Sequence, residues 1–353
     1  MKKIEEKIKV AFLDRDGVLI YEPQDTYQID SLEILRVLPG VTQGLKMLQD
    51  SGYKLVMITN QDGLGTKSFP TRDFTIVQNK LLDIFKKEKI SFHKIFICPH
   101  FEKDTCKCRK PKTGLVQKFL NEEDIEMEKS FMLGDRKSDE EFAQNIGVRF
   151  FQTEVNGTFP RLASIERNSK ETQIFVRCNL DGHGTFNIDS GVNFLNHMLE
   201  QFSKHSLIDL DIKARGDLHV DNHHTIEDVG LVLGETIRKA LGDKKGIKRY
   251  GFLLPMDDTL AEVAIDLSGR PYLVFNCDFK REQVGDLPTE MLEHFFESVA
   301  QTLKANIHIN IRYSKNEHHK IEAMFKAFAK SLRMAIEADS RQKNKLPSTK
   351  GIL

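Results

Sequence analysis

Residues 10–17 read VAFLDRDG, an apolar run that ends in two aspartates and a glycine. Four more short apolar runs follow it: LVMITN (55–60), KIFICP (94–99), SFMLGD (130–135) and VRFFQT (148–153). Stretches with the apolar spacing of helices lie between them, around 40–51, 71–89, 113–124 and 138–146. Strands that alternate with helices predict a doubly wound α/β domain with a mainly parallel sheet.

The second half of the chain contains an internal repeat. HHTIE (223–227) and HHKIE (318–322) each open a stretch with helical spacing. A histidine precedes each motif, His197 by 26 residues and His294 by 24, and a strand-like segment lies in each interval. Because order, spacing and motif all recur, we predict two similar α+β units packed as a pseudo-dimer.

The two halves are joined by a segment of a different character. Residues 152–170 contain Pro, Gly, Asn and Ser and show little periodicity, which is typical of a domain end and a linker. A chain of 353 residues is also long enough for two cores. We therefore expect one domain at 1–165 and an internally duplicated domain at 166–353.

Charge and cysteine content limit the class of protein. Lys plus Arg and Asp plus Glu number 52 each, so no overall charge favours nucleic acid or an anionic membrane as a partner. The N-terminus has no apolar signal-peptide core, and no apolar run approaches the ~20 residues of a membrane span. Three of the five cysteines fall within 98–108, which suits a metal clip in a reducing compartment. We expect a cytoplasmic protein.

Oxygen-rich and cationic residues follow several predicted strands of the first half. Asp14 and Asp16 follow one strand, Thr59 and Asn60 end another, and Asp135 ends a third. Ligands of open α/β sheets bind at the carboxyl ends of strands. A DxDG segment alone is common in loops, but the ordered set predicts a Mg²⁺ and phosphate site. The cations Arg109 and Lys110 lie between these segments.

A compact cysteine cluster lies just before these two cations. Cys98, His100, Cys106 and Cys108 supply four ligands within eleven residues, a set that matches closed tetrahedral structural zinc. A closed site leaves no position for chemistry, so the zinc would fix the loop that carries Arg109 and Lys110. The alternative is a loop of free thiols.

The repeated motif predicts a second kind of metal site. Residues three or four apart share a helix face, so Glu227 can join only one of His223 and His224 on an ion. The same holds for the second copy, with Glu322, His318 and His319. Adding His197 and His294 gives two sites of three histidines and one glutamate each. These ligands allow Mn²⁺, Fe²⁺ or Zn²⁺ with two open positions.

On DRDG (14–17), Thr59-Asn60, Arg109-Lys110 and GDRKSD (134–139), the first half resembles the haloacid-dehalogenase-like phosphatases. The resemblance implies that Asp14 attacks phosphorus and that Asp16 is the acid and base. Thr59 and Lys110 would hold the phosphoryl group, and Asp135 would share Mg²⁺ with Asp14. We add Asn60 and Arg109 to the expected phosphate contacts, and Asp16 to the expected Mg²⁺ ligands.

The second half is similar to the imidazoleglycerol-phosphate dehydratases over about 171–353. The motifs that carry the similarity include DLHVDNHHTIEDVGLVLG, DLSGRPY, NEHHKIEAMFKAF and PSTKG. Asn196 and Thr349 depart from the family pattern, which usually has Asp and Ser there, and neither is an expected ligand. In this order and length, the two halves together resemble the bifunctional bacterial histidine-biosynthesis family.

The second resemblance implies a detailed mechanism. Two Mn²⁺ ions would hold the substrate imidazole as imidazolate, and Glu171 would be the acid and base. The family also implies a shell of twenty-four subunits with metals at subunit interfaces and the phosphatase domains outside. The residues expected to bind the substrate phosphate are Arg249, Arg270, Lys326, Ser348 and Lys350.

Two other functions remain open at this point. The second half could be a non-catalytic, metal-dependent assembly module, and the phosphatase could act on a sugar bisphosphate such as a heptose. Fusion to a dehydratase favours histidinol phosphate instead. A nucleic-acid-binding zinc knuckle is disfavoured by the balanced charge and by the lack of interleaved aromatic and basic residues.

Overall fold

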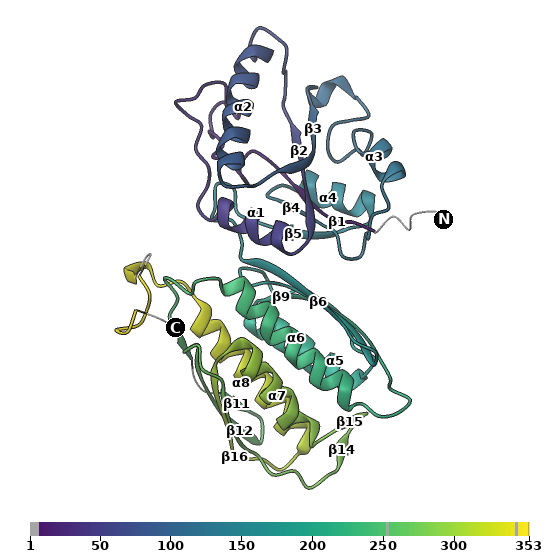
Figure 1. Cartoon of the computed structure of the whole chain (residues 1–353), viewed down its shortest axis with the longest axis vertical. Helices are drawn as coiled ribbons and strands as arrows, with labels where there is room; N and C mark the ends of the chain where they lie inside the picture. Colours follow the sequence, from purple (N-terminus) through teal and green to yellow (C-terminus); the bar gives the residue numbers. More distant parts are fainter. Residues whose placement is uncertain (1–6, 252–253, 343–344, 352) are drawn as a thin grey trace. The chain divides into compact units, whose positions relative to one another are not determined.

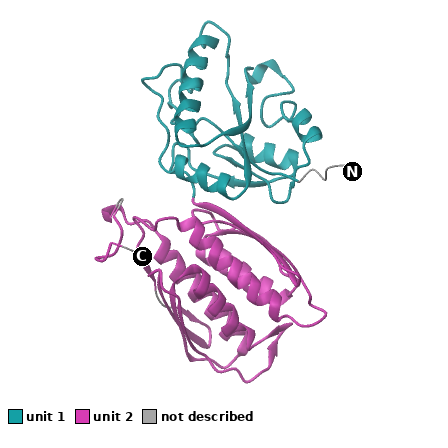
Figure 2. Cartoon of the chain, in the orientation of Figure 1, with its two compact units in different colours: residues 1–160 teal, residues 161–353 magenta. Residues whose placement is uncertain are grey.

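The computed structural model describes residues 7–251, 254–342, 345–351 and 353. The chain divides into two compact units, with the boundary between Pro160 and Arg161 (Figure 2). Each unit has its own sheets and its own buried core.

The first unit contains the expected parallel sheet. Its strand order is β3-β2-β1-β4-β5, and every neighbouring pair is parallel. The order changes direction at β1, which places the crevice for a ligand beyond the carboxyl end of that strand. The bounds are β1 (Lys9–Leu13), β2 (Tyr53–Asn60), β3 (Phe92–Cys98), β4 (Phe131–Gly134) and β5 (Arg149–Gln152).

Helices pack against this sheet (Figure 1). Phe119 of α3 and Phe142 of α4 meet Phe12 of β1 edge to face, at ring-centroid distances of 6.4 and 6.3 Å. Residues 10–13 of β1 are fully buried, which explains why this strand reads as a continuous apolar run. The helices are α1 (Val41–Asp50), α2 (Thr71–Lys87), the 3₁₀ turn η1 (Glu102–Asp104), α3 (Gln117–Glu122) and α4 (Lys137–Ile146).

The second unit confirms the internal duplication, because its two large sheets have the same plan. The orders are β6-β7-β9-β8 and β10-β12-β16-β13, and in each sheet only the last pair is parallel. The first sheet comprises β6 (Leu162–Asn168), β7 (Thr172–Asn179), β8 (Phe186–Asp189) and β9 (Asp209–Gly216). The second comprises β10 (Tyr250–Gly251), β12 (Thr259–Asp266), β13 (Tyr272–Asn276) and β16 (Asn306–Tyr313), and β11 (Leu254–Met256) also pairs with β12. A small hairpin joins β14 (Gln283–Val284) to β15 (Leu287–Pro288).

Four helices of this unit lie between the two sheets (Figure 1). They are α5 (Asn193–Ser206), α6 (His223–Leu241), α7 (Met291–Leu303) and α8 (Glu317–Ile336), followed by the 3₁₀ turn η2 (Ser340–Gln342). The first repeat supplies α5 and α6, and the second supplies α7 and α8. The helices pack across the repeats, α5 on α8 and α6 on α7. Phe202 of α5 stacks on Phe328 of α8 with ring centroids 5.5 Å apart.

The structure differs from the expected linker at one point. Residues 162–168 form β6, which pairs with β7 along its whole length and belongs to the second unit. Leu162 and Ala163 are buried, whereas residues 166–168 are exposed. Three buried residues followed by polar ones leave no alternating pattern, so only the pairing with β7 reveals this strand.

The position of β6 predicts which C-terminal fragments of the chain are stable. We expect residues 161–353 to fold when produced alone, whereas residues 166–353 lack half of β6 and the buried Leu162. Losing that burial should lower the melting temperature by roughly 3–12 °C. Thermal unfolding followed by circular dichroism compares the two fragments. Equal melting temperatures would show that β6 adds nothing to the second unit.

Candidate active sites

Three buried carboxylates meet at the carboxyl edge of the parallel sheet. Asp14 follows β1, Asp135 follows β4, and Asp139 lies in the first turn of α4. One oxygen of each lies within 4.8 Å of the others. Gly17, at φ 77°, completes the turn beside them, and a side chain at this position would lie 2.7 Å from an Asp135 oxygen. The turn therefore requires glycine twice, for its backbone and for its space.

Lys110 brings the positive charge into this cluster. Its ammonium nitrogen lies 2.7 Å from Asp14 Oδ1 and 2.6 Å from Asp139 Oδ1, and it donates to the Ile58 carbonyl at 3.1 Å. Burial lowers the pKa of Lys110, but Asp139 and Asp14 outweigh this effect, so its pKa is raised overall. Lys110 therefore stays protonated although it is buried.

Asn60 holds the backbone of Lys110 in place. Its side-chain oxygen accepts from the Lys110 N–H at 3.0 Å, and its amide donates to the Lys110 carbonyl at 3.2 Å. The sequence predicted Asn60 as a phosphate contact, but both ends of its amide bond Lys110. Its contribution in this structure is to position the lysine.

Asp16 lies apart from the carboxylate cluster. Its Oδ1 pairs with Arg15 at 2.5 Å, and Thr59 and Gln61 donate to its Oδ2. Among the described residues, the group suited to hold a metal contains Asp14, Asp135 and Asp139, but not Asp16. The carboxylate of Asp16 instead lies beside the Thr59 hydroxyl, with the two oxygens 3.4 Å apart.

The carboxylate cluster fits a bound cation. Both oxygens of Asp135 are buried and have no hydrogen-bond partner in the described part of the chain. Burial, then Asp139, raises the pKa of Asp135 to about 6, and burial with nearby carboxylates raises that of Asp14. Buried carboxylate oxygens that lie this close together and lack hydrogen-bond partners are stabilised by a hard cation such as Mg²⁺.

A cavity lined by both cations and carboxylates borders Lys110. It has a volume of about 520 Å³ and is also lined by Arg109, Lys112 and Lys137. The Arg109 guanidinium is paired with Asp62. Glu102 and Glu141 line the same cavity, so two carboxylates partly offset its four cations.

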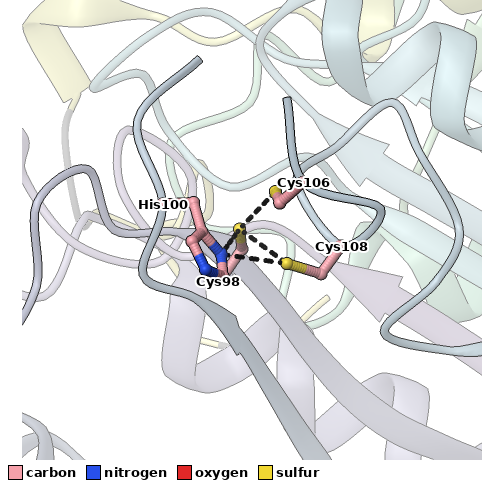
Figure 3. Close-up of side chains that lie close together, drawn as sticks. All are labelled: Cys98, His100, Cys106 and Cys108. Atoms are coloured by element: carbon pink, nitrogen blue, oxygen red, sulfur yellow. Dashed lines mark hydrogen bonds between the residues drawn. The ribbon is translucent and has the colours of Figure 1, made fainter. Parts of the chain in front are cut away.

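The four predicted soft ligands converge on one point (Figure 3). Cys98 Sγ lies 3.3 Å from Cys108 Sγ and 3.8 Å from Cys106 Sγ, and His100 Nδ1 lies 3.1 Å from Cys108 Sγ. A tetrahedral metal with sulfur bonds of about 2.3 Å keeps its sulfurs about 3.8 Å apart. The ligand set therefore has the size of a tetrahedral metal site. The Arg109 N–H donates to Cys106 Sγ at 3.3 Å, which ties the cation-bearing loop to this site.

In the second unit, each repeated motif turns one histidine toward its glutamate. His223 Nε2 lies 3.4 Å from Glu227 Oε2, and His318 Nε2 lies 3.4 Å from Glu322 Oε2. The other histidine of each pair points elsewhere. His224 Nδ1 lies 3.1 Å from Asp217 Oδ2, and His319 Nδ1 lies 2.5 Å from Asp258 Oδ1.

The upstream histidines join these motifs across the repeats. His197 of the first repeat lies beside His318 of the second, with ring centroids 6.1 Å apart, and His197, His318 and Glu322 form a group suited to a metal. His294 of the second repeat lies beside His223 of the first, with centroids 5.0 Å apart. Each upstream histidine lies beside the motif of the other repeat because α5 packs on α8 and α6 packs on α7.

The remaining predicted residues lie at several places in this unit. Glu171 is 58% exposed and its Oε2 lies 4.0 Å from His224 Nδ1. Arg249 pairs with Asp266 at 2.5 Å and donates to the Pro347 carbonyl at 2.9 Å, which brings it to the segment of Ser348 and Lys350. Lys326 Nζ lies 2.5 Å from Glu322. The backbone of Arg270 accepts from Asn306.

Comparison with known proteins gives the same division of the chain. The family model described as imidazoleglycerol-phosphate dehydratase matches residues 190–332, and the one described as polynucleotide kinase 3 phosphatase matches residues 9–155. The histidine biosynthesis bifunctional protein HisB of Campylobacter jejuni subsp. jejuni (strain 81-176) is 47% identical over 355 residues, covering 98% of this chain and 99% of that protein. The chain belongs to the HisB family.

Other relatives have the same character. HisB of Stenotrophomonas maltophilia (strain R551-3) is 47% identical over 359 residues, covering 98% of this chain and 99% of that protein. The crystal structure of imidazoleglycerol-phosphate dehydratase from Staphylococcus aureus is 41% identical and covers 50% of this chain and 99% of its own, with a TM-score of 0.46.

Membership of the HisB family makes this chain an enzyme of histidine biosynthesis with a lyase unit and a hydrolase unit. Enzymes of both kinds depend on metal ions, and the described residues offer groups that suit them. In the described ranges, no helix is long and apolar enough to cross a membrane.

Some site residues of this HisB family member were missed by the sequence analysis. Asp139 stands four residues after Asp135 at a helix start, and this spacing was the available signal. Gln61 follows Thr59 by two residues but carries no motif. Asp217 and Asp258 lie 7 and 61 residues from the histidines they contact, so local spacing could not identify Asp258.

Proposed function

We propose that the first unit hydrolyses histidinol phosphate to histidinol and phosphate, and that the second dehydrates imidazoleglycerol phosphate to imidazoleacetol phosphate. One observation carries this proposal: a single chain holds a lysine-bridged carboxylate cluster and also two histidine–glutamate clusters. The full-length HisB relatives support the pairing of these two activities. The two sites share no residue.

In the phosphatase unit, Asp14 is the nucleophile. Lys110 and the Arg15 N–H both contact Oδ1, so we assign the attack on phosphorus to Oδ2. As the bond to the leaving oxygen breaks, Asp16 gives that oxygen its proton. Asp16 then takes a proton from water, which attacks the aspartyl phosphate and restores Asp14. Thr59 and Lys110 hold the phosphoryl oxygens.

Two metals would serve the first unit. Asp14 and Asp135 would hold Mg²⁺, which when bound offsets the repulsion between the nucleophile and the anionic ester. Cys98, His100, Cys106 and Cys108 would hold Zn²⁺ in a closed site. The zinc would fix the loop on which Arg109 and Lys110 stand.

In the dehydratase unit, the substrate must lose a hydroxyl beside its imidazole and a proton from the next carbon. Two Mn²⁺ ions, when bound, would lower the pKa of the imidazole nitrogen. Glu171 lies near the ligand His224 and would move the proton at the reacting carbon. The phosphate would be bound by Arg249, Arg270, Lys326, Ser348 and Lys350.

The same ligands would control assembly. His224 and His319 point away from the clusters on their own helices, so a second copy is needed to bring each of them to an ion. We infer a shell of twenty-four copies with Mn²⁺ at the contacts between subunits, acting in the cytoplasm on small phosphate esters.

Asp14→Asn tests the independence of the two sites. The substitution should abolish hydrolysis of histidinol phosphate, because the amide cannot replace the carboxylate nucleophile. Dehydration of imidazoleglycerol phosphate should be unchanged. Parallel phosphate-release and dehydration assays measure both activities, with a heptose bisphosphate as a competing ester. If the wild-type chain hydrolyses the heptose ester faster, the assignment of histidinol phosphate as the substrate is wrong.

Cys106→Ser tests the metal clip. We expect the zinc content to fall from about one per chain and hydrolysis to fall roughly 10–100-fold, because Lys110 loses its support. Cys277→Ser, which changes a thiol outside the clip, should alter neither. Elemental analysis and phosphatase assays give the result. If the Cys106→Ser protein contains no zinc and is fully active, the zinc site is not needed for hydrolysis and the alternative of a free-thiol loop holds.

Metal removal tests the assembly. Chelation, or His223→Ala combined with His318→Ala, should convert a large particle into trimers and stop dehydration, because metal binding also supplies assembly free energy. Light scattering measures the mass with and without chelator. An unchanged particle after verified metal loss would place the ions inside one subunit.

A further inference from the structure

Two carboxylates contact His224 and His319, the histidines of the HHxxE motifs that do not face the glutamate of their own motif. Asp217 lies 3.1 Å from Nδ1 of His224, and Asp258 lies 2.5 Å from Nδ1 of His319. An ionised carboxylate can only accept a hydrogen bond, so each Nδ1 carries the proton. The lone pair of each ring is therefore on Nε2, the atom that remains available to a metal.

The two carboxylates do not come from equivalent positions of the duplicated fold. Asp258 directly precedes β12, and the equivalent residue in the first repeat is Glu171, which directly precedes β7. Asp217 directly follows β9, and its equivalent in the second repeat is Ser314, which directly follows β16. The carboxylate that contacts Nδ1 therefore precedes a strand in the second repeat, whereas in the first repeat it follows the neighbouring antiparallel strand.

Because the two carboxylates occupy different positions, Glu171 has different contacts from its equivalent, Asp258. In the second repeat, Asp258 takes the ring N–H, and the Ser314 hydroxyl bonds Thr259 at 2.7 Å instead. In the first repeat, Asp217 takes the ring N–H, and Glu171 stays 4.0 Å away and mostly exposed. The carboxylate at this position thus bonds the histidine ring in the second repeat, whereas in the first it lies beyond hydrogen-bond distance of the ring.

We propose that Asp217 and Asp258 are positioning residues that hold His224 and His319 with Nε2 presented to a metal, and that Asp217 thereby frees Glu171 for proton transfer. The inference rests on the proposed dehydratase function. A carboxylate behind a metal-binding histidine fixes both its tautomer and its ring orientation, and its loss typically weakens metal binding about 10–100-fold.

The proposal predicts that the two repeats respond differently. Asp258→Ala leaves His319 without a partner and should weaken Mn²⁺ binding about 10–100-fold. Asp217→Ala should weaken it less than about tenfold, because Glu171 is near enough to take over the His224 N–H. Adding Glu171→Ala to Asp217→Ala should restore the full loss, although Glu171→Ala alone leaves Mn²⁺ affinity unchanged. Such non-additivity is the signature of a shared partner.

The experiment is a Mn²⁺ titration of the metal-free full-length chain, with bound metal and particle mass as readouts and no substrate present. Asp189→Asn, an exposed acid paired with Arg215 in the same unit, is the matched control and should behave as wild type. Thermal unfolding of each variant, followed by circular dichroism, verifies that the second unit is folded. Because Mn²⁺ binding needs no turnover, a failure of the dehydratase proposal would appear separately, as a wild-type chain that binds Mn²⁺ without dehydrating imidazoleglycerol phosphate.

A dehydration assay at saturating Mn²⁺ supplies the second half of the test. Asp217→Ala should lower kcat more than Asp258→Ala does, because Glu171 is drawn onto His224 and leaves the reaction. Asp217→Asn, whose carbonyl still accepts from the ring, should recover most of the Mn²⁺ affinity. Equal Mn²⁺ losses in Asp217→Ala and Asp258→Ala, or additive effects of Asp217→Ala and Glu171→Ala, would overturn the proposal.

Discussion

The ion pairs of Lys110 with Asp14 and Asp139 are the interaction on which the first unit depends. A buried ammonium between two buried carboxylates is stable only while all partners stay in place, because any one left alone is an unpaired charge. This requirement explains the surrounding structure: Asn60 clamps the lysine backbone and the cysteine cluster ties down the preceding residues. The topology change at β1 supplies the edge where the partners can meet.

Much of the fold and of the sites could be predicted from the sequence, because their signals are local. The apolar runs predicted the parallel sheet, and the HHxxE motifs predicted the duplication. What remained hidden depends on pairing between distant segments. β6 shows no alternation, Asp258 lies far from His319 in sequence, and the cross-repeat partnership of His197 with His318 follows only from helix packing. The contacts of the Asp16 carboxylate with Arg15 and Gln61 carry no motif in the sequence either.

Duplication and divergence are both visible in the second unit. The two sheets keep one strand order, and both HHxxE motifs keep their His–Glu distance of 3.4 Å. The differences include the residues around His224 and His319, where Glu171 and Asp258 occupy equivalent positions with different contacts. The shared geometry thus surrounds the two HHxxE motifs, while the position of Glu171 carries a glutamate in one repeat and an aspartate, Asp258, in the other.

The packing of α5 on α8 and of α6 on α7 also separates two kinds of equilibrium. Each cluster draws one helix from each repeat of the same chain, so its formation is intramolecular and independent of protein concentration. Any contact between copies would obey mass action instead. The ligands of each cluster therefore stand together in a single chain at any dilution, before a second molecule arrives.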